Sequence, residues 1–277
     1  MPDLMPTISQ LYIYPIKSLG GIAVDRAMVT NRGLQFDRRF MLVDDDNFFI
    51  TQRRQPTMAL FRTFIEGEKL IVHHKDNTDE KLLVPLVPGL GTERTLVNVW
   101  EDFCEAQFVN DEADKWFSDK LDFSCRLVYM PESTQREVDT DYAIDKDITS
   151  FADDFHVLLI GETSLNDLNS RLEKPLPMNR FRPNMVMKGG TPFEEDTMEE
   201  FSINGIDFCG VKLCSRCVVT TIDQETGFTD REPLKTLATY RSFSNKLFFG
   251  QNVLCRGTGM VRIGDEIRIV KTKPSMG

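Results

Sequence analysis

Short hydrophobic runs separated by turn residues dominate the first part of the chain. Many of these runs are rich in β-branched and aromatic residues and alternate apolar with polar positions, as half-buried strands do. Gly-Gly, Asn-Arg-Gly and Glu-Gly-Glu sequences interrupt them, which favours hairpins of a mostly antiparallel β structure. The predicted strands are 8–16, 21–30, 38–43, 47–52, 59–66 and 69–74.

A helical pattern follows these strands. Residues 113–122 carry three large apolar side chains near helical spacing, which predicts a short amphipathic helix. The polar and acidic segment 133–154 then indicates an exposed connection. We place the domain boundary near residue 127, which gives an N-terminal domain, 1–127, and a C-terminal domain, 128–277.

The second unit is also rich in predicted strands. Residues 161–174 place three leucines on one face of a helix, with Thr163 or Ser164 as its N-cap. A second helix is predicted over 232–241, with Pro233 in its first turn. Strands are predicted over 156–160, 184–189, 201–214 and 217–222, followed by a hairpin over 260–270. The fold class predicted by these patterns is mostly β with a few helices (α+β).

Composition and charge limit the partners of the protein. A chain of 277 residues with 41% hydrophobic residues can build a sizeable core. Its 43 acidic and 33 basic residues give a net charge of -10, which opposes binding to nucleic acid. Residues 1–10 lack the pattern of a signal sequence, and no run approaches the roughly 20 apolar residues that span a bilayer. We therefore expect a cytoplasmic protein with reduced cysteines and without a membrane anchor.

Three of the six cysteines lie within nine residues. Cys209, Cys214 and Cys217 have C-x4-C-x2-C spacing, and with Cys255 they match the ligands of a plant-type [2Fe–2S] cluster. The bulky residues between Cys209 and Cys214 favour another interpretation, in which Cys209 and Cys255 are buried apolar residues. Cys217 differs, because the preceding Arg216 brings a cation that favours the thiolate form, which binds soft metals.

Basic residues also stand at the ends of predicted strands. Lysine and arginine suit phosphate, because arginine binds its oxygens in a bidentate manner and lysine adds a point charge. The alternative for each is a surface charge paired with a carboxylate. The sequence contains neither a phosphate-binding glycine loop nor a Ser-His-Asp order, so it does not support an ordinary hydrolase, kinase or nicotinamide enzyme. The basic positions are Lys17, Arg38, Arg39, Arg180 and Arg182.

Seven segments, in order and over nearly the whole chain, resemble a known family. They are 11–21, 33–42, 161–172, 179–187, 214–227, 232–241 and 249–253. Together they look like the molybdenum-cofactor sulfurase C-terminal (MOSC) domain proteins with an N-terminal β-barrel domain, among them the mitochondrial amidoxime-reducing component and its bacterial relatives. The resemblance implies two β-barrel-like domains with one molybdenum cofactor (Mo-molybdopterin) between them.

The resemblance also implies roles for individual residues. Cys217, which precedes the Thr-Thr-Ile-Asp stretch, corresponds to the catalytic cysteine that ligates molybdenum. The cofactor-binding residues that it implies are Lys17, Ser18, Arg38, Arg182, Ser215, Arg216, Cys217 and Asn252. Arg39 is the alternative to its neighbour Arg38, because the pair leaves the register open by one residue.

Further candidates lie in the segment where the family lines its cavity. Asp153 and Asp154 are expected to border the substrate. His156 departs from the residue expected at its position; it is either a proton donor or a hydrogen-bonded core histidine.

The function that follows from the resemblance is reduction of N-hydroxylated compounds by a molybdenum-dependent oxidoreductase. Since the chain has no flavin or nicotinamide motif, electrons are expected from a separate ferredoxin, flavoprotein or cytochrome. One alternative is a non-catalytic carrier of the cofactor or a sulfur-delivery module using the same residues. The other is a [2Fe–2S] electron-transfer protein.

Overall fold

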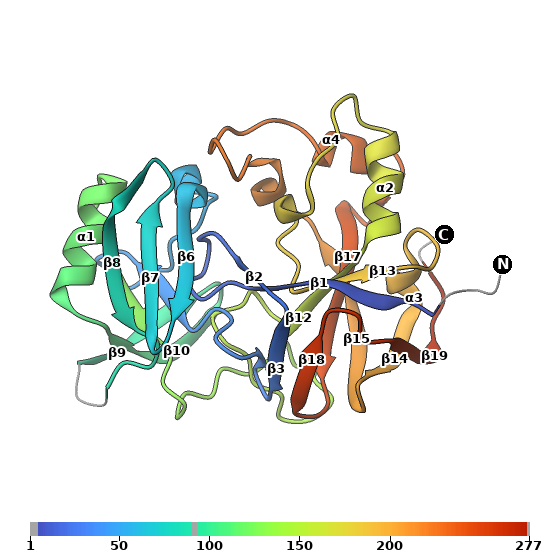
Figure 1. Cartoon of the computed structure of the whole chain (residues 1–277), viewed down its shortest axis with the longest axis horizontal. Helices are drawn as coiled ribbons and strands as arrows, with labels where there is room; N and C mark the ends of the chain where they lie inside the picture. Colours follow the sequence, from blue (N-terminus) through green and yellow to red (C-terminus); the bar gives the residue numbers. More distant parts are fainter. Residues whose placement is uncertain (1–4, 90–92, 276–277) are drawn as a thin grey trace.

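The computed structural model describes residues 5–89 and 93–275 and shows two β-rich lobes side by side (Figure 1). Residues 1–4, which belong to the segment without a signal-sequence pattern, lie outside the described residues. Within the described residues, no helix is long and apolar enough to cross a membrane.

The larger lobe is built on a nine-stranded sheet. Its order is β19-β14-β15-β17-β12-β13-β1-β2, and β16 pairs with β17. β12 and β13 are parallel, whereas β12 and β17 are antiparallel. The strands are β1 (Thr7–Ile13), β2 (Ile22–Val24), β12 (Val157–Gly161), β13 (Met185–Lys188), β14 (Met198–Ile203), β15 (Ile206–Ser215), β16 (Ser242–Phe243), β17 (Lys246–Cys255) and β19 (Ile267–Thr272).

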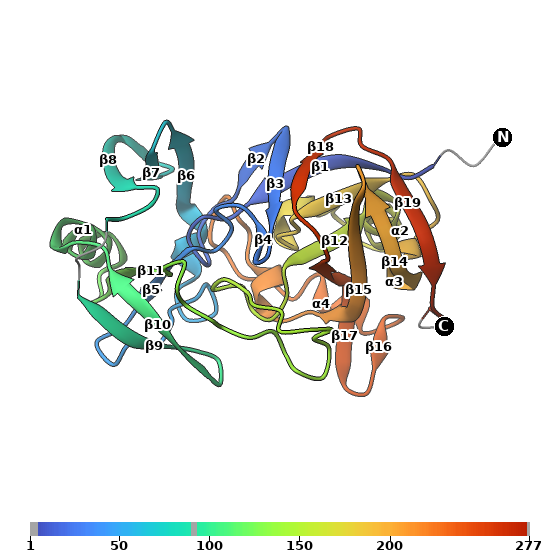
Figure 2. The ribbon, with the colours of Figure 1, turned by 90° about the horizontal axis from the view of Figure 1, so that it is seen from below.

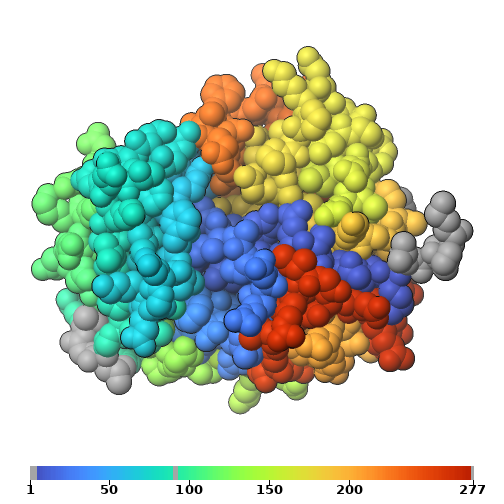
Figure 3. Space-filling model, viewed as in Figure 1, coloured from blue at the N-terminus to red at the C-terminus, as the bar shows by residue number. Residues whose placement is uncertain are grey.

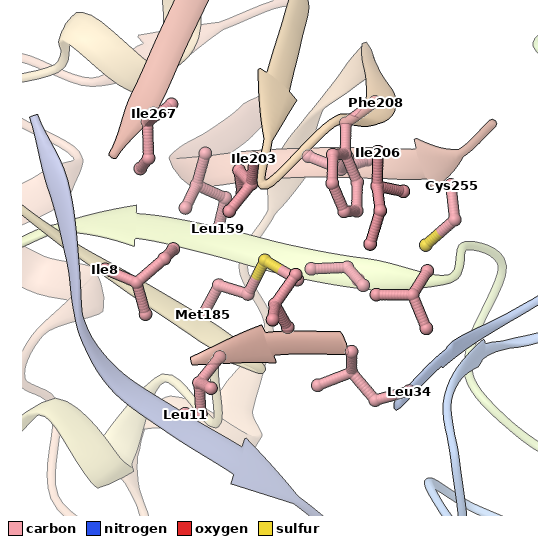
Figure 4. Packing of buried hydrophobic residues seen from close by; sticks show 14 of the residues in the cluster. Ile8, Leu11, Leu34, Leu159, Met185, Ile203, Ile206, Phe208, Cys255 and Ile267 are labelled. Atoms are coloured by element: carbon pink, nitrogen blue, oxygen red, sulfur yellow. The ribbon is translucent and has the colours of Figure 1, made fainter. Parts of the chain in front are cut away.

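One face of this sheet covers the main hydrophobic core. Ile8 of β1, Leu159 of β12, Met185 of β13 and Phe208 of β15 are almost fully buried and belong to one packed cluster (Figure 4). Burying side chains of this size stabilises a fold by about 1.5–3 kcal/mol each. The core therefore fixes the strands whose ends reach the candidate site.

Strands from both sides of the predicted boundary share this large sheet, since β1 pairs with β13. After β1 the chain passes to the other lobe, and residues 14–18 run beside residues 37–40. Lys17 N donates to Phe40 O (2.8 Å), and Arg38 N donates to Tyr14 O (2.7 Å). The space-filling view shows this N-terminal part of the chain (blue) between the two lobes (Figure 3). The domain boundary near residue 127 stays a prediction.

Three smaller sheets complete the β structure. The order β5-β11-β10-β9 and the order β6-β7-β8 form the other lobe, while β18-β3-β4 lies against the large sheet (Figure 2). Their strands are β3 (Arg26–Thr30), β4 (Gly33–Leu34), β5 (Phe40–Val43), β6 (Phe61–Glu66), β7 (Lys69–His74), β8 (Asn77–Pro85), β9 (Arg94–Val99), β10 (Asp102–Phe108), β11 (Arg126–Tyr129) and β18 (Gly259–Arg262).

The predicted helix over 113–122 is confirmed as α1 (Asp111–Leu121). Asn110 caps its N-terminus, because the side chain accepts a hydrogen bond from Ala113 N (2.8 Å). Phe117 and Leu121 are buried in the core of the smaller lobe, as the spacing predicted.

The second predicted helix is confirmed as α2 (Glu162–Ser170), but the N-cap prediction is wrong. Gly161 is the N-cap residue, and no side chain caps this end. The Ser164 hydroxyl instead donates to Glu195 Oε2 (2.7 Å) inside the core. The third predicted helix is shorter than expected, with Pro233 as the N-cap residue of α4. The remaining helices are α3 (Glu194–Thr197), α4 (Leu234–Leu237), η1 (Pro56–Leu60), η2 (Met178–Arg180) and η3 (Val218–Thr221).

The predicted strand over 217–222 is wrong, because these residues form the 3₁₀ helix η3. The Thr220 hydroxyl donates to Cys217 O (2.9 Å), and the Thr221 hydroxyl donates to Val218 O (2.7 Å). Side-chain hydrogen bonds of this kind compete with sheet pairing and outweigh the β propensity of valine and threonine.

Two further strand predictions need correction. The predicted hairpin over 260–270 is not a pair, because β18 pairs with β3 and β19 pairs with β14. Val261 and Ile267 are both fully buried in the main core, so burial rather than the connecting turn decides their partners. Residues 47–52 form isolated bridges at Phe48 and Phe49 instead of a strand.

Candidate functional site

A cavity of about 160 Å³ lies between the two lobes, lined by side chains from distant parts of the chain. All ten side chains that the sequence analysis proposed for cofactor or substrate line it. They are Lys17, Ser18, Arg38, Asp153, Asp154, Arg182, Ser215, Arg216, Cys217 and Asn252. The fold therefore brings these ten side chains together, which one sequence is unable to show. The role of each residue stays a prediction.

Cys217 stands where strand β15 ends and η3 begins. Its backbone is extended (φ -122°, ψ -179°), and its side chain is partly exposed to the cavity. Arg53 donates to Cys217 Sγ from Nε (3.4 Å) and from Nη2 (3.2 Å). Arg216, the cation expected beside this thiol, instead donates to Cys214 Sγ (2.9 Å). The cation at Cys217 thus comes from the opposite lobe.

Two guanidinium groups share the aromatic ring of Tyr14. Arg38 Cζ lies 4.5 Å and Arg182 Cζ 4.3 Å from the ring centroid. Burial lowers the pKa of Arg182 to about 10, against only partial compensation from Tyr14 and Asp37. Burial raises the pKa of the Tyr14 phenol, so the ring stays neutral between the two cations. Arg39 contacts Glu132 and Met130 O outside the cavity, so of the arginine pair it is Arg38 that reaches the site.

Backbone strain accompanies these cations. Ser18 (φ 68°), Arg38 (φ 50°) and Arg182 (φ 55°) all adopt the left-handed conformation, which is uncommon for residues other than glycine. Such conformations persist only where surrounding contacts fix them, and they concentrate at functional sites. Trp100 (φ 59°), which also lines the cavity, adopts this conformation too, so the strain at these lining residues marks the cavity as a site that the fold maintains.

Lys17 and Asp153 form an ion pair at the cavity wall. Lys17 Nζ donates to Asp153 Oδ1 (2.6 Å) and to Phe151 O (2.7 Å), and Trp100 Nε1 also donates to Asp153 Oδ1 (3.2 Å). Although burial acts to raise it, the pKa of Asp153 is lowered by Lys17 and stays below its ordinary value. Burial, together with the nearby Asp153 charge, raises the pKa of Asp154. The two adjacent carboxyls thus have opposite tendencies to hold a proton.

The four cysteines of the [2Fe–2S] alternative do not converge. Cys209 faces Leu254 across the β15–β17 ladder, and Cys255 is buried in the main core. Within residues 5–89 and 93–275 there is no group of three or more His, Cys, Asp or Glu side chains placed to hold a metal ion. The [2Fe–2S] alternative is therefore wrong, and Cys255 is a buried apolar residue.

His156 is a core histidine rather than a proton donor to the cavity. It is 1% exposed, its Nδ1 accepts from Cys255 N (3.0 Å), and its Nε2 lies 2.9 Å from Ile148 O. The backbone N–H at Nδ1 fixes the neutral tautomer that donates from Nε2. Burial lowers the pKa of His156 from 6.5 to about 4.

We expect His156 to make the stability of the protein depend on pH. The folded-state pKa lies below the unfolded value of 6.5, so the unfolded state takes up the proton first as pH falls. The stabilising effect is complete above pH 6.5 and is lost between pH 6.5 and about 4. By pH 5 the loss should be about 2 kcal/mol. Other groups also titrate between pH 7.5 and pH 5, so urea unfolding should show a change in stability that is less favourable by about 2 kcal/mol in wild type and in His74→Gln than in His156→Gln. Equal pH dependence in all three would contradict the assignment.

Several lining residues escaped the sequence analysis. The cavity is also lined by Thr51, Arg53, Trp100 and Asn184, none of which was predicted to have a role. The first three lie outside the seven segments that resemble the family, and Asn184 lies within the segment 179–187. The available signal was a pair of arginines at 53–54 in an acidic chain. This pair of arginines did not indicate which cysteine Arg53 would contact.

The fold and the cavity define a class of protein with two β lobes around a cation-lined cavity that also presents the thiols of Cys214 and Cys217. Comparison with models of protein families and with known proteins assigns the chain to a family of this class. The model of the MOSC N-terminal beta barrel domain matches residues 5–124, and that of the MOSC domain matches residues 146–268. The chain is 32% identical over 282 residues to mitochondrial amidoxime-reducing component 1 of Mus musculus, covering 95% of this chain and 82% of that protein.

Two further relatives extend the comparison. Mitochondrial amidoxime reducing component 2 of Bos taurus is 31% identical, with 94% of this chain and 82% of that protein covered. Molybdenum cofactor sulfurase of Oryza sativa subsp. japonica is 31% identical over 88% of this chain but only 32% of that protein. The chain therefore belongs to the MOSC-domain family that includes the amidoxime-reducing components. This confirms the resemblance and the fold class predicted from the sequence.

Proposed function

We propose that this protein is a molybdenum cofactor-dependent reductase of N-hydroxylated compounds that receives its electrons from a separate protein. The observation that carries the proposal is one cavity in which the Cys217 thiol lies among five basic side chains. These are Lys17, Arg38, Arg53, Arg182 and Arg216. The family relationship to amidoxime-reducing components supports the same class of chemistry.

The residues present fit an anionic cofactor. Arg182 Nη2 and Arg216 Nε are buried and have no hydrogen-bond partner within residues 5–89 and 93–275. A buried donor without a partner costs about 1–3 kcal/mol, more when it is charged, so these atoms suit a ligand that supplies acceptors. Five cations but only two carboxylates, those of Asp153 and Asp154, line the cavity, in a protein of net charge -10. Behind the lining residues, Asp37 pairs with Arg38. Phosphate and pterin oxygens are acceptors of this kind.

In this proposal each lining residue has one task. Cys217 would bind molybdenum through its sulfur, which is a soft ligand. When bound, the cofactor supplies the two-electron chemistry that accepts oxygen from an N–OH group. The residues assigned to hold it are Lys17, Ser18, Arg38, Arg182, Ser215, Arg216 and Asn252.

Converting an N–OH group to N–H with release of water consumes two electrons and two protons. Asp153 is held as an anion by Lys17 and is therefore a poor proton source. Asp154 has a raised pKa and lines the same cavity, so its carboxyl oxygens are the better place to hold a proton near the substrate. Asp153 instead orients the Trp100 indole at the cavity wall.

The need for a separate electron donor gives a direct test. Protein produced in a host that makes the molybdenum cofactor should reduce benzamidoxime with reduced methyl viologen and should show no turnover with NADH alone, because the chain has no flavin or nicotinamide motif. Turnover with NADH alone would contradict the separate donor. A molybdenum-loaded protein that fails with methyl viologen would contradict the reductase and favour the carrier alternative.

A further inference from the structure

The side chain of Arg53 donates two hydrogen bonds to the sulfur of the proposed metal ligand. Its Nε and Nη2 lie 3.4 and 3.2 Å from Cys217 Sγ, so two N–H groups of one planar guanidinium point at one sulfur. A fork of this kind restricts the direction of the sulfur more than a single donor does. Arg53 belongs to the turn that follows Thr51, in a different lobe from Cys217.

Arg53 is itself held in place by Trp100. The guanidinium carbon lies 4.1 Å from the centroid of the Trp100 ring, and the indole N–H donates to Asp153 Oδ1 (3.2 Å). Asp153 is fixed in turn by Lys17. Trp100 adopts a left-handed backbone conformation (φ 59°) in the turn between β9 and β10, which is unusual for a bulky residue. A chain of contacts therefore leads from the cavity wall to Cys217 Sγ.

Neighbouring arginines do not share this arrangement. Arg54 has a side chain that is 63% exposed and pairs with Asp44 on the surface. Arg216, next to Cys217 in sequence, donates to Cys214 Sγ and to Phe181 O. Among these three arginines, only Arg53 contacts Cys217 Sγ.

We propose that Arg53 is a positioning residue for Cys217, and that Trp100 holds Arg53 in the orientation this requires. The inference rests on the proposed function, in which the Cys217 sulfur binds molybdenum. Hydrogen bonds to a metal-bound thiolate reduce the electron density that it donates, which favours the reduced metal and raises its reduction potential. Arg53 thereby sets both the direction of the sulfur and the potential of the site.

The experiment compares Arg53→Met, Arg53→Lys and Trp100→Ala with wild type, and Arg54→Met is the matched control. Each protein is loaded in a cofactor-producing host, and its molybdenum content and circular dichroism are measured. The reduction potential is then titrated by the electron paramagnetic resonance signal of molybdenum, which reports only the loaded fraction. Steady-state kinetics with benzamidoxime and reduced methyl viologen separate kcat from KM.

We expect Arg53→Met to lower the potential and to reduce kcat about tenfold with KM unchanged, as for other residues that support a metal ligand. Arg53→Lys keeps the charge but loses the fork, so its potential should lie between those of Arg53→Met and wild type. Trp100→Ala should shift the potential in the same direction as Arg53→Met. Arg54→Met should match wild type in every measurement.

The outcomes separate this inference from the proposed function. A wild-type protein without molybdenum would overturn both. A loaded and active wild type with an unchanged potential in Arg53→Met would overturn the inference alone. An increase of KM without change in potential would assign Arg53 to the substrate instead. If Arg53→Met fails to fold, the test rests on Arg53→Lys. A reduction potential equal to that of wild type in Arg53→Lys would exclude a role for the two guanidinium N–H groups that donate to the Cys217 sulfur.

Discussion

Replacing Cys217 with serine is expected to abolish reduction of N-hydroxylated compounds while leaving the fold intact. A serine hydroxyl is a harder and weaker ligand than a thiolate, so molybdenum would lose the soft ligand that the proposal assigns to it. The other thiol that lines the cavity, Cys214, accepts a hydrogen bond from Arg216 (2.9 Å). Substitution of residues that support a metal ligand lowers activity about 10–100-fold. Loss of the ligand itself should therefore lower activity by more than about 100-fold. Stability should change by less than about 0.5 kcal/mol, because Cys217 is only partly buried and its side chain is not packed in a core cluster.

The matched control for this prediction is Cys209→Ser. Cys209 lies on the same strand, β15, but does not line the cavity. Elemental analysis should find stoichiometric molybdenum in wild type and in Cys209→Ser, with loss of molybdenum or of activity in Cys217→Ser. A Cys217→Ser protein with wild-type activity would refute the role of this thiol. Iron in place of molybdenum in the wild-type protein would refute the cofactor assignment.

Replacing Arg182 with methionine is expected to have opposite effects on the empty and the loaded protein. In protein made without cofactor, the variant should be more stable by about 1 kcal/mol, or roughly 2–4 °C in Tm. It removes a cation whose buried Nη2 has no hydrogen-bond partner in the described part of the chain. The same change should weaken retention of the cofactor by about 30-fold or more, because a charge-assisted contact to its phosphate or pterin would be lost. Thermal unfolding of the empty protein and molybdenum content after loading measure the two effects.

Arg180→Met is the contrasting variant two residues away. The Arg180 guanidinium donates to Thr220 O and Thr221 O and pairs with Asp223, so all of its side chain is engaged. Its removal should destabilise the empty protein by about 2 kcal/mol, since those acceptors lose their donors. If Arg182→Met destabilised the empty protein as Arg180→Met does, Arg182 would be a structural residue and its assignment to the cofactor would fail.

Local sequence patterns predicted a helix or strand correctly where the spacing of apolar residues within one short segment indicates it. The helix α1 followed from apolar spacing, and the run predicted as strand over 201–214 lies within β14 and β15. Two strand predictions failed for different reasons. Local hydrogen bonds from threonine hydroxyls fold residues 217–222 into η3, whereas β18 pairs with the distant strand β3 instead of β19.

For the candidate site, the sequence alone determined which residues resemble those of the family, with Cys217, Lys17 and Arg182 among them. Only the tertiary structure decided that these side chains meet, because they are separated by up to about 200 positions and converge through β1 joining the large sheet. It also decided that Arg53, rather than the adjacent Arg216, contacts the Cys217 sulfur. The reason is physical: sequence patterns report local periodicity and residue type, whereas the contacts of a long side chain depend on which lobe the fold brings against it.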